Sequence, residues 1–210
     1  MPAPRRTYQV RALVNDKANS SAIKDGLEWL LNSVGERDVG IIFLSGHGML
    51  DERGRFYFMG AGSDPARLRA TAVPRDEFAD VIRDLKGRIV MLIDACHAGS
   101  VTGGKGDAFD MNKVLNDFKN DRGVLIYAAS TGSQASVEHV DWQNGAFTKA
   151  VLEGLGRPGE RARAVARAGE PITTSNLDAY ITGRVKELTK GNQTPIMIRT
   201  ISDFELAIAR

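Results

Sequence analysis

Three short apolar runs occur along the chain, and none of them alternates between apolar and polar positions. They cover residues 39–44, 88–93 and 124–129. Continuous runs of this length are typical of strands that helices cover on both faces of a parallel sheet. Apolar residues at helical spacing in 23–34 and 78–85 predict helices between the strands. Strands that alternate with helices predict an α/β fold with a parallel, doubly wound sheet.

Shorter segments complete the predicted order of elements. Val10–Val14 is expected to be a strand, and Asn19, Ser20 and Ser21 are capping candidates for the helix that follows. The helix with the apolar positions 78–85 is expected to start near Pro74. The other expected elements are an exposed hairpin-like segment at 51–59, a glycine-rich loop at 100–107, a long loop at 154–171, a helix at about 174–188 and an extended run at 195–201.

Composition and charge narrow the class of protein. The 210 residues suffice for one domain, 1–210, with a substantial core. The 28 basic and 26 acidic residues leave a net charge of +2, too small to predict a nucleic acid or an anionic membrane as partner. No apolar stretch approaches the roughly 20 residues of a membrane span, and the first residues lack the apolar centre of a signal peptide. We therefore expect a cytoplasmic protein.

The single cysteine excludes a disulfide within the chain. One thiol and three scattered histidines do not have the spacing of a structural zinc site, so we expect neither a metal nor a cofactor. Cys96 is therefore either a core residue or a reactive thiol, and its neighbours in the sequence decide between these roles.

Two segments with reactive side chains close the first two apolar runs. Ser45-Gly-His-Gly48 follows one run and Asp94-Ala-Cys-His-Ala-Gly99 follows the other, so His47 precedes Cys96 by 49 residues. Open α/β sheets place their chemistry where strands end. The two motifs are therefore expected at one sheet edge, an arrangement typical of a cysteine peptidase.

Each motif supplies a part of that chemistry. Cys96 is the candidate nucleophile and His47 the candidate general base, because a thiol attacks a carbonyl as the thiolate. The glycines beside His47 leave room for a substrate carbonyl. The backbone amides of Gly48 and Cys96 are candidate donors to the developing oxyanion.

The remaining polar residues near these motifs have other expected roles. His97 adjoins Cys96 and points in a different direction, which favours a structural role, and His139 is expected in a surface loop. Strand alternation places Asp94 on the same face as the thiol. Its carboxylate is either a buried hydrogen-bonding group or the floor of a pocket that selects a cationic side chain, and the sequence leaves both open.

The two motifs in order resemble the caspase and metacaspase superfamily of cysteine peptidases. The resemblance rests on Phe43-Leu-Ser-Gly-His-Gly48 and Leu92-Ile-Asp-Ala-Cys-His-Ala-Gly99, and it continues through 128–138 and 145–148 to cover about residues 8–200. It implies a three-layer sandwich with a mostly parallel sheet flanked by helices. It also implies a large-subunit-like part at about 8–122, a small-subunit-like part at about 123–210, and a Cys96–His47 dyad that forms a thioacyl-enzyme with protein or peptide substrates.

The resemblance also implies a specificity. Caspases carry Gln two residues before the cysteine and cut after Asp, whereas metacaspase-like members carry Asp there and prefer Arg or Lys. This chain has Asp94, so we expect cleavage after Arg or Lys, with Ser130 and Glu138 as further residues of the pocket. Gly132 and Ser133 stand where metacaspases carry acidic residues, so the sequence does not support a calcium requirement.

One departure from the family pattern concerns the start of the sheet. The family's sheet opens with a central strand and helix, whereas this chain begins at the strand expected to follow them. We therefore expect unpaired strand edges in the sheet. The chain is then a fragment, a processed product, or dependent on a missing N-terminal segment or partner domain.

Basic residues in two polar stretches are candidates for self-cleavage. They are Lys105, within Gly-Gly-Lys-Gly, and Arg122, before Gly123. A caspase-like interaction domain without useful catalysis remains the alternative function. A flavodoxin-like nucleotide or redox domain is disfavoured, because no Gly-x-Gly-x-x-Gly or Walker-type loop follows the first strand.

Overall fold

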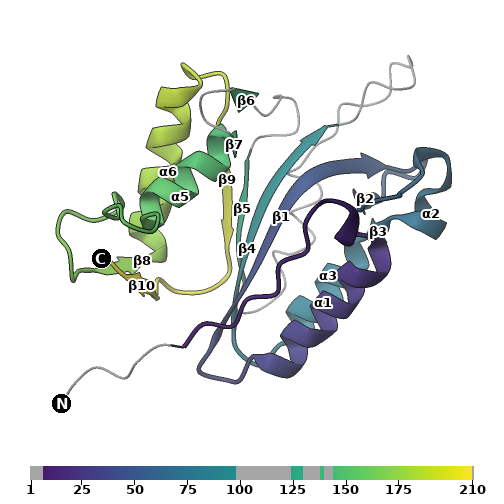
Figure 1. The fold of residues 1–210 in the computed structure, drawn as a ribbon, viewed down its shortest axis with the longest axis horizontal. Coiled ribbons are helices and arrows are strands. Elements are labelled where there is room, and N and C mark those ends of the chain that lie inside the picture. The colour runs from purple at the N-terminus through teal and green to yellow at the C-terminus, as the bar shows by residue number, and fades with distance from the viewer. Residues whose placement is uncertain (1–6, 98–123, 130–137, 140–143, 210) are drawn as a thin grey trace.

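The computed structural model describes residues 7–97, 124–129, 138–139 and 144–209. Its main feature is a six-stranded sheet with the order β3-β2-β1-β4-β5-β9 (Figure 1). The strands are β1 (Val39–Leu50), β2 (Phe56–Met59), β3 (Val73–Pro74), β4 (Arg88–His97), β5 (Val124–Ala128) and β9 (Ile196–Arg199).

Parallel pairing holds the centre of this sheet together. β4 pairs with β1 from Arg88 to His97 and with β5 from Ile89 to Ile93, and both pairings are parallel. β2, β3 and β9 extend the sheet at its margins by antiparallel pairing. The parallel pairs place the carboxyl ends of β1 and β4 at one edge of the sheet, as the sequence predicts.

Two helices cover each face of the sheet. α1 (Ser20–Ser33) and α3 (Arg75–Asp84) pack on one face through a core that includes Ile42, Ile89 and Ile126. α5 (Ala146–Leu155) and α6 (Thr174–Leu188) pack on the other face, against side chains of β4 and β5 (Figure 1). This three-layer α/β sandwich confirms the predicted fold class.

Short elements connect these layers. Residues 156–170 form the predicted long loop after α5. The remaining elements are η1 (Asn15–Lys17), η2 (Pro65–Arg67), α2 (Leu68–Thr71), β6 (Glu138–His139), β7 (Asn144–Gly145), β8 (Pro171–Thr173) and β10 (Glu205–Ile208), in which β6 pairs with β7 and β8 with β10.

Local sequence signals set the helix boundaries. The side chain of Asn19 accepts a hydrogen bond from the backbone N–H of Ala22 and so caps α1, one of the predicted caps. Thr173 and Asn176 form a capping box at the start of α6, which spans the predicted 174–188. α3 follows Pro74 and buries its predicted apolar stripe.

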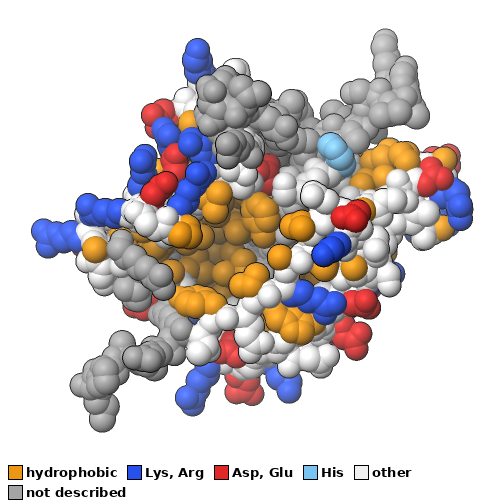
Figure 2. All heavy atoms as spheres, in the orientation of Figure 1, with side chains coloured by type: hydrophobic (Ala, Val, Ile, Leu, Met, Phe, Trp, Pro, Cys, Tyr) orange, Lys and Arg blue, Asp and Glu red, His pale blue; other side chains and the backbone are white. Residues whose placement is uncertain are grey.

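β1 departs from the prediction that helices cover both of its faces. Gly40, Ile42 and Leu44 are buried, but Ile41 and Phe43 are 52% and 45% exposed. α5 and α6 pack against β4 and β5 and leave this face of β1 open. In Figure 2 apolar side chains gather in the middle of one face of the molecule. A continuous apolar run therefore corresponds to burial on both faces of the strand in β4 and β5, but not in β1.

The prediction of a strand at Val10–Val14 is wrong. Residues 7–14 form no strand, and Val10 and Val14 are 85% and 60% exposed. The segment contacts α1 and the core instead. Leu13 packs against the core, and Arg11 Nη1 donates a hydrogen bond to the carbonyl oxygen of Asp25 in α1 at 3.0 Å. A strand exists only where a neighbour pairs with its backbone, and this segment has no such neighbour among the described residues.

β1 has fewer described pairing partners on one side than on the other. On the side away from β4, β2 pairs only with His47 to Leu50. Residues 39–46 therefore pair on one side alone within the part of the chain that the structure describes.

The predicted hairpin at 51–59 is present, and its turn at 52–55 is exposed while the strand that follows is buried. Asp51 organises its turn by accepting hydrogen bonds from the backbone N–H groups of Arg53 and Arg55 and from the Arg55 guanidinium. The bond from the Arg55 side chain is the main cause that lowers the pKa of Asp51 to about 2. The three aromatic residues 56–58 of β2 are buried, because Phe56 and Phe58 pack into the core that α1 and α3 cover and Tyr57 packs with Leu68 and Ala72.

Candidate active site

The two motifs meet near the carboxyl ends of β1 and β4. The parallel register pairs His47 with Cys96 and Gly48 with His97. Paired positions on neighbouring strands lie about 4.8 Å apart across the sheet. His47 is exposed. The sequence prediction that both motifs reach one edge is thus confirmed at the level of the backbone.

The same register brings a second pair of polar residues together. Ser45 pairs with Asp94, one step of strand alternation before His47 and Cys96. Ser45 is exposed, whereas Asp94 is only 6% exposed. Sequence reasoning did not single out Ser45. The spacing in the sequence could have indicated this residue, because Ser45 precedes His47 by two positions, just as Asp94 precedes Cys96 by two.

Asp94 is tied to the first turn of α5. Its Oδ2 accepts hydrogen bonds from the hydroxyl of Thr148 and from the backbone N–H of the same residue, the latter at 3.3 Å. The N-cap residue of α5, Gly145, has no side chain to cap the helix. The carboxylate of Asp94 in β4 therefore caps the helix in place of an N-cap side chain, and it lies at the positive end of the helix dipole.

Gly145 makes room for this carboxylate. A Cβ at this position would lie 3.0 Å from Oδ2 of Asp94, closer than side-chain atoms normally approach. Glu138 of β6 pairs in register with Gly145, so its backbone also lies at the start of α5. The structure shows that Asp94 is a buried hydrogen-bonding group, and its role in a pocket stays a prediction.

The hairpin after β1 shapes the backbone around His47. The ring of Phe56 packs so closely on Gly48 that a Cβ there would lie 2.8 Å from Cζ, and a Cβ on Gly46 would lie 3.2 Å from Cζ of Phe58. Both aromatic side chains are buried. Glycine on each side of His47 therefore lets two core rings approach the strand that carries it.

Comparison with known proteins identifies this arrangement. The model of the caspase domain family matches residues 5–203. The chain belongs to the caspase domain family. That family is one of cysteine peptidases, which confirms the superfamily inferred from the two motifs.

The fold of this caspase domain has a solved counterpart. The crystal structure of protein GSU0716 from Geobacter sulfurreducens is similar with a TM-score of 0.55 and 14% identity, over 87% of this chain and 73% of that one. At this identity the likeness supports the fold alone. No curated protein matches the chain.

Several predicted site residues of the caspase domain lie outside the described residues. These are Ser130, Lys105 and Arg122.

The residue before Ser130 is described. The carbonyl oxygen of Ala129 accepts a hydrogen bond at 2.8 Å from the side-chain amide of Gln193, which is fully buried. Gln193 thereby holds the end of β5, a contact across 64 residues that sequence reasoning missed.

The described part of the caspase domain shows no group of three or more metal-binding side chains. None of its described helices has the length and apolar character needed to cross a bilayer.

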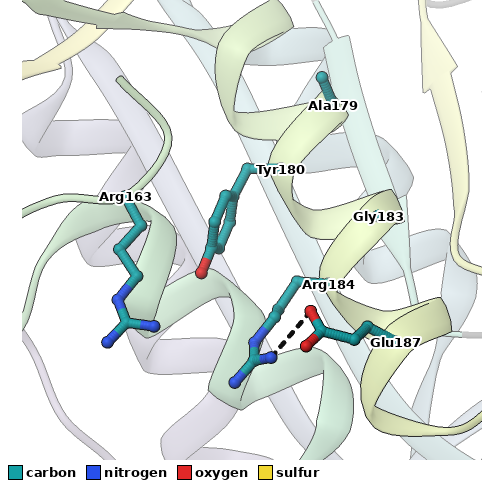
Figure 3. Close-up of a pocket in the computed structure, with 6 residues that line it drawn as sticks. All are labelled: Arg163, Ala179, Tyr180, Gly183, Arg184 and Glu187. Carbon is teal, nitrogen blue, oxygen red and sulfur yellow. Dashed lines mark ion pairs between the residues drawn. The ribbon is translucent and has the colours of Figure 1, made fainter. Parts of the chain in front are cut away.

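One pocket of the caspase domain involves none of the predicted site residues. It has a volume of about 470 Å³ and lies between α6 and the loop at 156–170 (Figure 3). Its lining residues are Arg163, Ala179, Tyr180, Gly183, Arg184 and Glu187.

A buried carboxylate, Glu153, underlies this pocket. It accepts hydrogen bonds from Tyr180 at 3.0 Å and Arg184 at 2.7 Å, and Lys149 lies at 3.1 Å. Burial raises the pKa of Glu153, but these donors outweigh that effect and lower it to about 2. Glu153 and Lys149 belong to α5, and Tyr180 and Arg184 belong to α6. The network therefore joins the two helices and stabilises their packing.

Proposed function

We propose that this caspase domain is a cysteine endopeptidase with Cys96 as nucleophile and His47 as general acid and base. The observation that carries the proposal is the register of β1 and β4, which pairs the backbones of these two residues at one sheet edge. Both elements are long strands that carry buried residues before the motifs, such as Ile42 in β1 and Ile93 in β4. Membership of a family of cysteine peptidases supports the same reaction.

In the proposed reaction His47 takes the thiol proton of Cys96, and the resulting thiolate attacks the carbonyl carbon of the scissile peptide bond. The carbonyl oxygen becomes an oxyanion, for which the backbone N–H groups of Gly48 and Cys96 are the proposed donors. His47 then gives its proton to the leaving amine, and the C–N bond breaks to leave a thioester. Water, deprotonated by His47, attacks the thioester and releases the acid product and the free thiol.

We further propose that the enzyme cleaves after Arg or Lys. Asp94 supports this selectivity, because a carboxylate two residues before the nucleophile is held at the same sheet edge and is 6% exposed. A desolvated carboxylate binds a guanidinium or ammonium group far better than it binds a neutral side chain. Ser130 and Glu138 are the other proposed residues of the pocket. Glu138 is supported by its register position beside Gly145.

Self-cleavage at Lys105 or Arg122 follows from the same specificity. Both are basic residues in polar stretches between β4 and β5. The proposal requires no cofactor and no calcium, and its partners are protein or peptide substrates.

The test is hydrolysis of fluorogenic peptides that end in Arg, Lys or Asp, with calcium or with a chelator. Release after Arg or Lys that is lost in Cys96→Ala is the expected result. Release only after Asp would contradict the role given to Asp94. No release by folded protein would favour the alternative function, a caspase domain that binds other proteins without cleaving them.

A further inference from the structure

The start of α5 is built around the Asp94 carboxylate. A helix begins with backbone N–H groups that lack partners within the helix, and a side chain of the N-cap residue usually satisfies one of them. α5 begins after Gly145, which has no side chain. The carboxylate of Asp94 reaches the third helical residue, Thr148, from β4 and bonds both its N–H and its hydroxyl.

Three features fix the carboxylate in one orientation. The hydroxyl of Thr148 and the N–H of the same residue both bond to Oδ2. The missing side chain of Gly145 leaves the space that Oδ2 occupies, since a Cβ there would lie 3.0 Å away. Hydrogen bonds to an ionised acceptor are stronger than neutral ones and more directional in effect. The acid is thus oriented before any substrate arrives.

We propose that Thr148 is a positioning residue that sets the preference of this enzyme for a cationic side chain, because its hydroxyl holds the Asp94 carboxylate in the orientation that receives the cation. The inference rests on the proposed function. Thr148 does not touch the reacting atoms in this scheme. The Thr148 hydroxyl orients the Asp94 carboxylate in advance, so substrate binding does not have to supply the free energy for ordering it.

The alternative role for Thr148 is structural. In that case the hydroxyl only stabilises the start of α5, and its loss lowers the melting temperature without changing how the enzyme selects substrates. The two roles differ in KM, because an orienting bond acts on cation binding whereas a helix cap acts on folding.

The chain offers a matched pair of variants at this position. Thr148→Val keeps the shape of the side chain and removes the hydroxyl, whereas Thr148→Ser keeps the hydroxyl and removes the methyl group. The substrates are two peptides that differ only in their last residue, Arg or citrulline, because citrulline has nearly the shape of Arg without its charge. Labelling of Cys96 with iodoacetamide counts the competent sites in each preparation.

We expect Thr148→Val to raise KM for the Arg peptide roughly tenfold, near the lower limit of the effect of one lost hydrogen bond to a charged group. Its kcat should stay within about twofold of wild type, and its preference for Arg over citrulline should fall by the same factor as the rise in KM. Thr148→Ser should resemble wild type in all three quantities. Equal KM values for the Val and Ser variants, or a loss confined to kcat, would overturn the inference.

Gly145→Ala provides a second route if the Val variant does not fold. Its methyl group would crowd Oδ2 of Asp94 while every charge remains, so we expect a similar rise in KM for Arg. An unchanged KM would count against the inference. Failure of the proposed function looks different, because wild type itself would then show no cleavage that depends on Cys96 or no preference for Arg over citrulline.

Discussion

Phe56 lies directly against the backbone of Gly48, and its ring fills the space that any side chain at position 48 would need. The contact joins the buried hairpin strand β2 to the residue that follows His47. Packing of the core therefore sets the path of the backbone at the candidate active site.

We expect Gly48→Ala to destabilise the protein by about 1–3 kcal/mol, the usual cost of forcing extra atoms into a packed core. It should also lower activity, because relief of the overlap moves either Phe56 or the backbone beside His47. Urea denaturation and peptide hydrolysis measure the two effects. Gly183→Ala is the control. Its Cβ meets nothing within 4 Å in α6, so it should stabilise the helix by roughly 0.5–1 kcal/mol.

Asp94→Asn separates selectivity from helix capping. Asp203 is the matched control, since its carboxylate also caps a helix through Thr174 Oγ1 at 2.5 Å and the Ser175 N–H at 2.8 Å, at the start of α6. Each Asn variant should lose about 1 kcal/mol of stability. Only Asp94→Asn should lower kcat/KM for the Arg peptide, by at least roughly tenfold. Equal activity in the two variants would contradict the pocket role of Asp94.

Glu153 should make stability depend on pH in the acid range. Its pKa is about 2 in the folded protein against the ordinary 4.5 of a Glu side chain, so the unfolded chain binds the proton more readily. Its contribution, on the order of 3 kcal/mol, is complete above about pH 4.5 and is lost as the pH falls towards 2.

The measurement is urea denaturation of Glu153→Gln and wild type at pH 7 and pH 3. The difference between them should shrink as the pH falls. Glu187→Gln removes the other partner of Arg184, but that carboxylate side chain is 70% exposed and its loss should cost under about 1 kcal/mol. A gap between Glu153→Gln and wild type that stays constant with pH would contradict this account.

Self-cleavage should produce fragments that end at Lys105 or Arg122. Mass spectrometry of the purified wild-type protein should find these termini, and Cys96→Ala should yield a single intact chain. Lys105→Gln and Arg122→Gln should each remove one cut and leave the other. Fragments that persist in Cys96→Ala would show that another protease makes them.

The two faces of β1 should tolerate substitution differently. Ile41 is 52% exposed and its neighbour Ile42 is 8% exposed. Ile41→Thr should therefore change stability by no more than about 0.5 kcal/mol, whereas Ile42→Thr should cost roughly 2 kcal/mol or more. Thermal unfolding of the two variants is the test, and similar melting temperatures would mean that the exposed face of β1 is covered in solution.

Local signals in the sequence predicted much of this fold. The helix α6 spans the predicted 174–188, and the centre of the sheet follows from its apolar runs. The pairing of His47 with Cys96 follows from parallel strands that end at one edge. In each case the information lies within a few residues of the element that it specifies.

Contacts between distant segments were not predictable in this way. The run at 39–44 has the same pattern whether one face or two are covered, so it could not reveal that Ile41 and Phe43 are exposed. The segment 7–14 looks extended, but a strand depends on a neighbour that the segment itself does not encode. Asp94 and Thr148 lie 54 residues apart, and no pattern in either segment indicates that they meet.

The parallel pairing of β4 with β5 has a consequence for a protein cut at Lys105 or Arg122. The two central strands would then belong to separate polypeptides, joined through side chains such as Val90 and Leu125 that are almost completely buried. The native molecule would survive dilution as a two-chain protein. Its refolding from denaturant would become a second-order reaction, which is slower at lower protein concentration. The uncut chain would refold with a rate constant that does not depend on concentration.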